Sequence, residues 1–276
     1  MSYIKILIIL SIFFIIITLI ISYLIYRELK ENITYSKYKK VFNLYYEMLC
    51  FSLKNTLKTN IKEITNYEGN KNLRIEQKIP YNIIQTFKTR KVTESMYNIT
   101  RKWINYNPEY NYMFFDDNEI NDYINKEEFK DFEFSKEDFL TCYNSIKPGA
   151  GKADLFRLLI IYNLGGCYFD IDTQPIKPLK DFIYNDDEVV SGIGGRGDFH
   201  QWGLIYIKNH IFIKKTLELA VKNINNQKIK KDIKSLEYIT GPPCMDEAIK
   251  DSLKSLWMDK ILKCPLLKLK VKLYEK

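Results

Sequence analysis

Two carboxylates stand one residue apart in the stretch "GGCYFDIDTQPIKPL", at the end of an aromatic run that follows a double glycine. In an extended chain alternate side chains project to the same side, so Asp170 and Asp172 are expected to face the same way. Two like charges held together repel each other unless a cation lies between them. Carboxylate oxygens suit Mg²⁺ or Mn²⁺, which usually complete their coordination with phosphate oxygens of a substrate. The pair therefore predicts a divalent metal site, with Asp170 and Asp172 as ligands, that holds a diphosphate.

Two further charged residues precede the pair on a predicted helix. In "AGKADLFRLLIIYNLGG" the apolar residues recur at helical spacing and form a core face, and Gly165 and Gly166 end the helix. Asp154 and Arg157 are three residues apart, so they lie on one flank and can point toward one spot. Arg157 would supply a cationic contact there, and Asp154 would accept hydrogen bonds from sugar hydroxyls. An Asp-x-Asp pair alone is better explained as an exposed acidic turn, but this combination favours a binding site.

The surrounding segments indicate the elements that must position these residues. "IPYNIIQTFKT" predicts a first strand, "ESMYNITRKWINYNP" a helix that ends before Pro108, and "YNYMFFDD" a second strand. "NEINDYINKEEF" and "SKEDFLTCYNSI" predict two more helices, and "CYFDID" predicts a strand after the double glycine. An order of strand, helix and strand with short links favours an α/β domain with a mainly parallel central sheet.

Length and composition limit the class of protein. The 276 residues suffice for a short appendage and one α/β domain, and 46% hydrophobic and 14% aromatic residues exclude wholesale disorder. The net charge of +8 favours anionic partners such as nucleotide diphosphates or a membrane surface, or simply reflects a Lys-rich composition. No compact basic and aromatic array stands out, so no nucleic-acid partner is predicted. The five cysteines have no CxxC pairing, and they predict neither a zinc site nor a disulfide framework.

The amino-terminal part predicts attachment to a membrane. After a short tail (1–5), residues 6–26 contain no charge and would form a helix of about 32 Å, which matches a bilayer core. Residues 27–75 have the polar composition and intermittent apolar spacing of a helical stem, and residues 76–276 form the globular domain. The orientation of this single-pass protein stays open. Positive residues after the span favour a cytosolic body, whereas glycosylation sequons at Asn32 and Asn98 fit a luminal one.

The stretch "ADLFRLLIIYNLGGCYFDIDTQPIKPL" resembles the signature of the DXD-containing glycosyltransferases of family 32. These include fungal Golgi α-1,6-mannosyltransferases and the mannosyl transferases acting on inositol phosphoceramide. The resemblance extends from about Ile79 to Ile249 and includes "IPYNIIQTFKT", "WINYNPEYNYMFFDD", "HQWGLIYIKNHIF" and "YITGPPCMDEAI" in that order. It implies a GT-A type, Rossmann-like transferase domain and a retaining transfer from a nucleotide-activated sugar.

The resemblance also implies roles for individual residues. Asp172 would bind Mn²⁺ or Mg²⁺, and Asp170 would touch both the metal and the ribose or sugar of the donor. Asp154 and Arg157 would hold the donor sugar, and Phe87 stands where related enzymes carry a base-stacking Trp. The remaining residues implied to bind substrate are Gln85, Tyr168 and Gly241. No nucleophile can be singled out, which favours a front-face displacement over a covalent intermediate.

The resulting hypothesis is a membrane-anchored, metal-dependent hexosyltransferase, with mannose as the favoured sugar. Its donor would be a GDP- or UDP-hexose and its acceptor a glycan or glycolipid. The alternative is a catalytically silent, membrane-bound sugar-binding or scaffold protein of the same fold. This alternative is motivated by Ile84 and Phe87, which stand where relatives often carry His and Trp. The repulsive pair of Asp170 and Asp172 favours the enzyme, because a silent relative has no physical reason to keep it.

Overall fold

The computed structural model describes Tyr23 and residues 60–192, 198–226, 233–263 and 271–274. The chain divides into two units, Met1–Thr59 and Asn60–Lys276. The predicted anchor at residues 6–26 lies outside the described residues except for Tyr23, as does the predicted stem up to residue 59. Within the described residues, no helix combines the length and the apolar character that crossing a bilayer requires.

The second unit is built on a sheet whose described strands run in the order β4-β2-β5-β7-β6-β8. The strands β2, β4 and β5 form a parallel group, and β7 pairs antiparallel with both β5 and β6. The bounds are β2 Asn82–Thr86, β4 Asn111–Phe115, β5 Gly166–Phe169, β6 Val189–Gly192, β7 Gly203–Tyr206 and β8 Val271–Tyr274.

The sheet is therefore mixed: three of its five described strand pairs are parallel and two are antiparallel, so the prediction of a mainly parallel sheet holds only in part. The prediction rested on alternating strands and helices, and this alternation does hold for β2, helix α3 (Glu94–Tyr106) and β4. After β5 the chain departs from it, because β6 leads into β7 without an intervening described helix. Strands joined by a short connection pair antiparallel, whereas a parallel pair needs a longer crossover. The β7 strand then lies between β5 and β6 and reverses the direction in the middle of the sheet.

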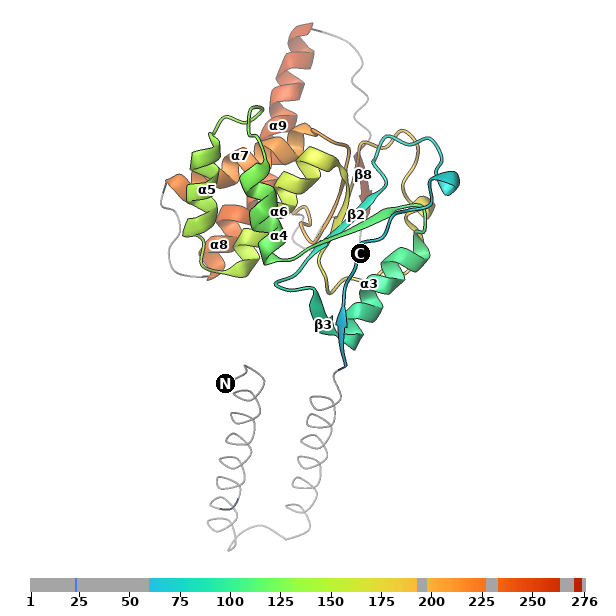
Figure 1. Cartoon of the computed structure of the whole chain (residues 1–276). Coiled ribbons are helices and arrows are strands. Elements are labelled where there is room, and N and C mark those ends of the chain that lie inside the picture. The colour runs from blue at the N-terminus through green and yellow to red at the C-terminus, as the bar shows by residue number, and fades with distance from the viewer. Residues whose placement is uncertain (1–22, 24–59, 193–197, 227–232, 264–270, 275–276) are drawn as a thin grey trace, which may run out of the picture. The chain divides into compact units, whose positions relative to one another are not determined.

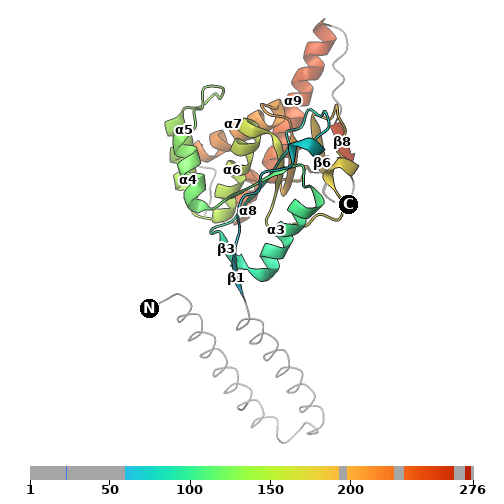
Figure 2. The same ribbon diagram turned by 45° about the vertical axis from the view of Figure 1, so that its right-hand side comes forward.

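Helices cover both faces of this sheet, so the unit has three layers (Figures 1 and 2). Ile84 and Tyr168 belong to the hydrophobic cluster that includes residues of helices α4 to α9, whereas Ile83 and Cys167 belong to the cluster around α3. The two-residue period of a strand explains this division. Besides α3, the helices are α4 Asp117–Lys126, α5 Lys136–Ser145, α6 Gly149–Leu164, α7 Ile211–Asn225, α8 Ile233–Thr240 and α9 Pro242–Lys263.

Local sequence signals fix the ends of several helices, and the end of α6 at the double glycine is as predicted. The α4 helix begins with a capping box, in which Asp116 accepts the backbone N–H of Glu119 and the Glu119 side chain accepts the N–H of Asp116. The α6 helix ends before the double glycine. Gly165 has φ +64° and Gly166 has φ +103°, and a Cβ atom on Gly165 would lie 2.6 Å from the backbone nitrogen of Lys208. Only glycine fits this turn without strain, and it leads α6 directly into β5.

The compact unit begins within the segment that the sequence predicts as a stem. Strand β1 (Ile61–Glu63) pairs antiparallel with β3 (Lys91–Thr93), and a short 3-10 helix covers Lys71–Leu73. A second 3-10 helix, Leu179–Asp181, follows the acidic pair. Residues 60–75 thus pack as part of the globular unit, which places its start at Asn60.

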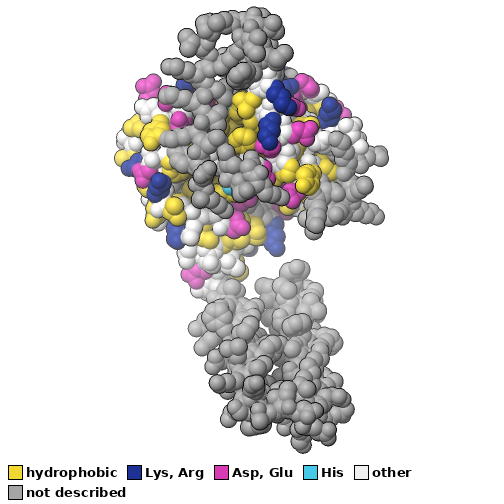
Figure 3. All heavy atoms as spheres, turned by 180° about the vertical axis from the view of Figure 1, so that it is seen from behind, with side chains coloured by type: hydrophobic (Ala, Val, Ile, Leu, Met, Phe, Trp, Pro, Cys, Tyr) yellow, Lys and Arg dark blue, Asp and Glu magenta, His cyan; other side chains and the backbone are white. Residues whose placement is uncertain are grey.

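Charges of both signs lie interspersed among the described side chains on the face shown in Figure 3. The described residues on this face therefore offer no extended basic patch.

Candidate active site

Arg157 lies at the centre of a charged cluster at the carboxyl end of β5. Its Nη1 atom lies 3.2 Å from Oδ1 of Asp154, one turn earlier on α6, and its Nη2 atom lies 2.9 Å from Oδ1 of Asp170. Nη1 also donates to the backbone carbonyl of Gln201 at 3.1 Å. The guanidinium group packs over the Tyr168 ring, with 5.0 Å between Cζ and the ring centroid. Burial alone would lower the pKa of Arg157, but Tyr168, Asp154 and Asp170 raise it, so Arg157 remains a cation.

Asp154 is held from both of its oxygens. Oδ1 pairs with Arg157, and Oδ2 accepts a hydrogen bond of 2.8 Å from the Thr240 hydroxyl. Burial raises the pKa of Asp154 above its usual range, although the Arg157 charge and the Thr240 hydrogen bond favour the ionised form. Both oxygens keep a lone pair that can accept a hydrogen bond from a ligand hydroxyl.

Asp170 connects the cluster to the end of the strand. Besides Arg157, its Oδ1 atom accepts the Tyr168 hydroxyl at 3.1 Å, whereas within the described residues Oδ2 has no partner. Burial raises the pKa of Asp170, against the opposing effects of Arg157 and of the Tyr168 hydrogen bond, and the nearby Asp172 raises it further. Burial also raises the pKa of Tyr168 to about 12, so this hydroxyl donates and does not ionise.

Asp172 lies in a turn and not in the strand. β5 ends at Phe169, and the Thr173 backbone N–H and hydroxyl both donate to the Asp170 carbonyl, at 3.0 and 2.6 Å. The Asp172 side chain is exposed and contacts no described residue through a hydrogen bond or ion pair. Trp103 of α3 steadies this turn by donating its indole N–H to the Thr173 carbonyl at 3.0 Å. Asp170 is thus fixed by the protein, and Asp172 faces solvent beside it.

Gln85 and Tyr168, both predicted to bind substrate, are buried behind the acidic pair. The Gln85 side chain donates to the Asp170 carbonyl at 3.1 Å and accepts the Tyr112 hydroxyl at 2.9 Å. The Tyr168 hydroxyl lies 3.1 Å from the hydroxyl of Thr86. In this structure both residues therefore contact Asp170.

Phe87 follows β2 and lines a pocket of about 380 Å³ between the end of that strand and helices α4, α5 and α6. The pocket wall includes Lys88, Tyr143, Lys152 and Ala153. Phe87 is half-buried, and the Lys88 ammonium group lies 5.8 Å from the centroid of its ring. Because Ala153 immediately precedes Asp154 on α6, the pocket adjoins the charged cluster.

Two residues of the cluster, Gln201 and Thr240, carry no signal that singles them out in the sequence. The Gln201 side chain is buried and donates to the carbonyls of Thr240 and Gly241, at 3.1 and 3.2 Å. Gly241, predicted to bind substrate, lies between α8 and α9, where a Cβ atom would come within 2.6 Å of the Glu237 carbonyl oxygen. The motifs "HQWGLIYI" and "TGPP" point to these segments, but neither motif shows which side chain reaches Asp154 or Arg157.

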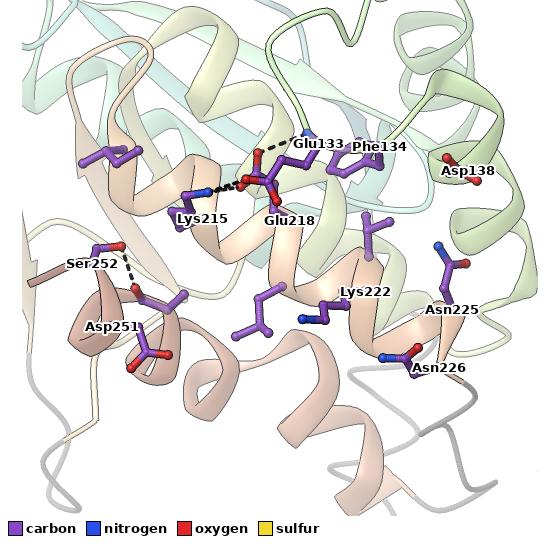
Figure 4. A pocket seen from close by; sticks show the side chains of 14 residues that line it. Glu133, Phe134, Asp138, Lys215, Glu218, Lys222, Asn225, Asn226, Asp251 and Ser252 are labelled. Carbon is purple, nitrogen blue, oxygen red and sulfur yellow. Dashed lines mark hydrogen bonds and ion pairs between the residues drawn. The ribbon is translucent and has the colours of Figure 1, made fainter. Parts of the chain in front are cut away.

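A larger pocket, of about 730 Å³, lies between α5, α7 and α9 and shares no residue with this cluster. In Figure 4 the Lys215 ammonium group points toward Glu133 and Glu218, and it lies 2.8 Å from a carboxylate oxygen of each. The Glu218 carboxylate also accepts the backbone N–H of Glu133 at 3.2 Å. These contacts connect the segment before α5 to α7, which is a structural role.

The donor set of the cluster fits a hard divalent cation. Asp154 and Asp170 pair with Arg157 and the exposed Asp172 lies beside them, which leaves a formal excess of two negative charges (three minus one). The free Oδ2 of Asp170 and the exposed Asp172 are oxygen ligands of the kind that Mg²⁺ and Mn²⁺ prefer. The described residues contain no group of three His, Cys, Asp or Glu side chains placed to bind a metal. Mg²⁺ held by one or two carboxylates usually completes its coordination with water and substrate phosphate oxygens.

Comparison with known proteins agrees with this chemistry. Residues 93–190 match the family described as "Glycosyltransferase sugar-binding region containing DXD motif". These residues include the acidic pair and its Arg157 partner, so the chain carries a region of the DXD-motif glycosyltransferase family. The resemblance to DXD-containing glycosyltransferases inferred from the sequence is confirmed.

The curated relatives specify the group further. The chain is 28% identical over 197 residues to the initiation-specific α-1,6-mannosyltransferase of Schizosaccharomyces pombe, covering 63% of this chain and 49% of that protein. It is 29% identical over 106 residues to inositol phosphoceramide mannosyltransferase 3 of the same organism, covering 38% and 28%. Over 90 residues it is 31% identical to the Candida albicans initiation-specific α-1,6-mannosyltransferase, covering 29% and 23%. The chain thus spans half or less of the length of these fungal mannosyltransferases, which are of the family 32 type.

A solved structure supports the fold. The PaToxG glycosyltransferase superposes with a TM-score of 0.50 and 20% identity, covering 67% of this chain and 74% of that chain. At this identity the similarity concerns the fold alone, which is an α/β glycosyltransferase fold with a mixed sheet.

Proposed function

We propose that the protein transfers a hexose, with mannose favoured, from a GDP- or UDP-sugar to a glycan or glycolipid with retention of anomeric configuration. The observation that carries the proposal is the bridge that Arg157 forms between Asp154 and Asp170, beside the exposed Asp172. The mannosyltransferase relatives support the choice of sugar.

The geometry suggests how a donor would lie. The pocket beside Phe87 would take the base, because an aromatic ring can stack on a nucleobase and a lysine lines the same wall. The sugar would lie against the neighbouring Asp154 and Arg157, whose side chains are 15% and 9% exposed. Asp154 would accept hydroxyl protons there, and Arg157 would contact oxygen atoms of the donor as a fixed cation.

Asp170 and Asp172 would hold Mn²⁺ or Mg²⁺. When bound, the metal would stabilise the leaving diphosphate as a Lewis acid. Arg157 contributes by fixing Asp170 before substrate arrives, so that one of its oxygens is constrained and the other faces outward.

The arrangement favours a front-face displacement. A carboxylate nucleophile must be free to attack the sugar carbon, yet Asp154 is engaged through both oxygens and Asp170 is engaged through Oδ1. Both carboxylates are therefore better suited to orient the donor. The acceptor proton would then pass to the leaving diphosphate and not to a protein side chain.

The membrane anchor at residues 6–26 is part of the proposal, with the catalytic unit on either side of the membrane. A glycosidase-sensitive shift in mobility that disappears in Asn32→Gln and Asn98→Gln would place the unit in the lumen. If the protein is not glycosylated and its globular unit is accessible to protease from the cytosol, the catalytic unit is cytosolic instead.

The test of the proposed activity is hydrolysis and transfer with a panel of GDP- and UDP-hexoses in the presence of Mn²⁺. We expect turnover of one donor class, abolished in Asp172→Asn and retained in Asp251→Asn. Asp251 is a suitable control because it is an exposed aspartate on α9, paired only with Lys254 among the described residues. Donor binding without turnover, in any acceptor mixture, would instead support the silent sugar-binding alternative.

A further inference from the structure

The charged cluster is closed into a ring by two uncharged side chains. Arg157 pairs with Asp154 and donates to the Gln201 carbonyl, the Gln201 side chain donates to the Thr240 carbonyl, and the Thr240 hydroxyl donates to Asp154. The ring joins α6, the segment before β7, and the junction of α8 and α9. These segments lie far apart in sequence, so the contacts hold tertiary structure together at the cluster.

Gln201 makes hydrogen bonds through both its side-chain amide and its backbone carbonyl. Its side-chain amide donates to the carbonyls of Thr240 and Gly241, at the end of α8, where helical carbonyls lack intrahelical partners. Its own carbonyl accepts Arg157, and the carbonyl of the next residue, Trp202, accepts the backbone N–H of Asp170 at 2.9 Å. The same two residues therefore fix both the arginine and the first carboxylate of the acidic pair.

Thr240 fixes the Asp154 carboxylate. Its hydroxyl has one proton, and it lies 2.8 Å from Oδ2 of Asp154 but 3.3 Å from the Leu236 carbonyl. The shorter contact is to a charged acceptor, and hydrogen bonds to ionised groups are the stronger ones. With Arg157 on one oxygen and Thr240 on the other, the plane of the Asp154 carboxylate cannot rotate freely.

We propose that Thr240 and Gln201 are positioning residues that hold Asp154 and Arg157 in the orientation that binds the donor sugar. The inference rests on the proposed function. It assigns two different roles: the ring of hydrogen bonds would orient the groups that bind the sugar, and the pocket beside Phe87 would bind the nucleotide.

The test compares the binding of a nucleotide-sugar with that of its nucleoside diphosphate by calorimetry. The donor is the one selected in the donor panel, and Mn²⁺ is present throughout. Thr240→Val removes the hydroxyl with little change in volume, and Thr240→Ser keeps a hydroxyl. Thr216→Val is the matched control, because Thr216 is also fully buried on a helix and donates to a helical carbonyl, that of Phe212.

Thr240→Val should weaken binding of the nucleotide-sugar about tenfold, the effect of one lost hydrogen bond to a charged group. Binding of the nucleoside diphosphate should stay within about twofold of wild type, Thr240→Ser should recover most of the affinity for the sugar donor, and Thr216→Val should bind both ligands normally. Gln201→Met, if it folds, should show the same selective loss. If it does not fold, the Thr240 variants decide.

The inference would be overturned if Thr240→Val bound both ligands as wild type does, or lost both equally. It would also be overturned if Thr240→Ser failed to recover binding. Absence of any nucleotide-sugar binding by the wild-type protein would overturn the proposed function together with the inference, so the two failures are distinguishable.

Discussion

Replacing Arg157 by methionine should destabilise the protein more than any other single change at the site. Arg157 is buried and makes three charge-assisted contacts, to Asp154 at 3.2 Å, to Asp170 at 2.9 Å and to the Gln201 carbonyl at 3.1 Å. Removing one partner of a buried ion pair leaves an uncompensated charge and costs about 3–5 kcal/mol. Domains of about 150–250 residues lose about 2–4 °C of Tm per kcal/mol, so Tm should fall by about 6–20 °C.

The assay is thermal unfolding of wild type, Arg157→Met and the double variant Asp154→Asn/Arg157→Met. The double variant should be more stable than Arg157→Met, because the buried carboxylate that lost its cation is now neutral. The deficit of Arg157→Met should also shrink as pH falls. Asp154 has a raised pKa in the folded state, so its ionised form costs stability as pH rises, and the loss of Arg157 increases that cost.

Two results would refute this reasoning. A Tm within about 2 °C of wild type would mean that the bridge contributes under 1 kcal/mol, as exposed ion pairs do. A double variant less stable than Arg157→Met would mean that Asp154 is stabilised by groups other than the arginine.

Three further outcomes can be checked with the same preparations. Trp103→Phe keeps a ring in the core but loses the hydrogen bond to the Thr173 carbonyl. The free energy of unfolding, measured by chemical denaturation, should therefore fall by about 1 kcal/mol, and Mn²⁺-dependent donor binding should weaken. Unchanged donor binding would show that this indole does not support the turn. Burial lowers the pKa of His210 to about 4, so stability should rise with pH between about 4 and 6.5, and His210→Asn, which keeps an N-cap acceptor, should flatten that rise in pH-dependent unfolding. Phe87→Ala should weaken binding of the nucleoside diphosphate by about 5- to 150-fold, as the loss of one base-stacking ring would, and equal affinity by calorimetry would place the base elsewhere.

The local parts of the site could be predicted because they follow from short-range rules. Helical spacing places Asp154 and Arg157 on one flank of α6, and the glycines that end α6 are visible in the sequence as a pair. The two-residue period correctly separates Cys167 from Tyr168 on opposite faces of the sheet. Each of these features depends on neighbours within a few residues.

The remaining features depend on contacts that the sequence does not encode locally. The bond between Thr240 and Asp154 joins residues 86 positions apart, and that between Gln85 and Asp170 joins residues 85 apart. The strand pattern also continues through Asp172 in the sequence, yet the strand ends at Phe169 because Thr173 folds back onto the Asp170 carbonyl. Hydrophobic alternation cannot reveal a hydrogen bond that ends the strand.

The mixed sheet has the same kind of cause. Alternating strands and helices correctly indicate the parallel group of β2, β4 and β5. β-branched runs indicate that a segment is a strand, but they do not determine which strands it pairs with. The position of β7 between β5 and β6 could therefore not be predicted from them.

The most direct test of the account is calorimetric titration of a nucleotide-sugar panel into wild type, Asp172→Asn and Asp251→Asn, with and without Mn²⁺. Loss of residues that merely support metal ligands costs about 10- to 100-fold in metal affinity or activity, so loss of the ligand Asp172 should cost at least as much. We predict Mn²⁺-dependent binding of one donor class by wild type and Asp251→Asn, and its loss in Asp172→Asn. Equal binding by Asp172→Asn, or binding that does not depend on Mn²⁺, would contradict the account.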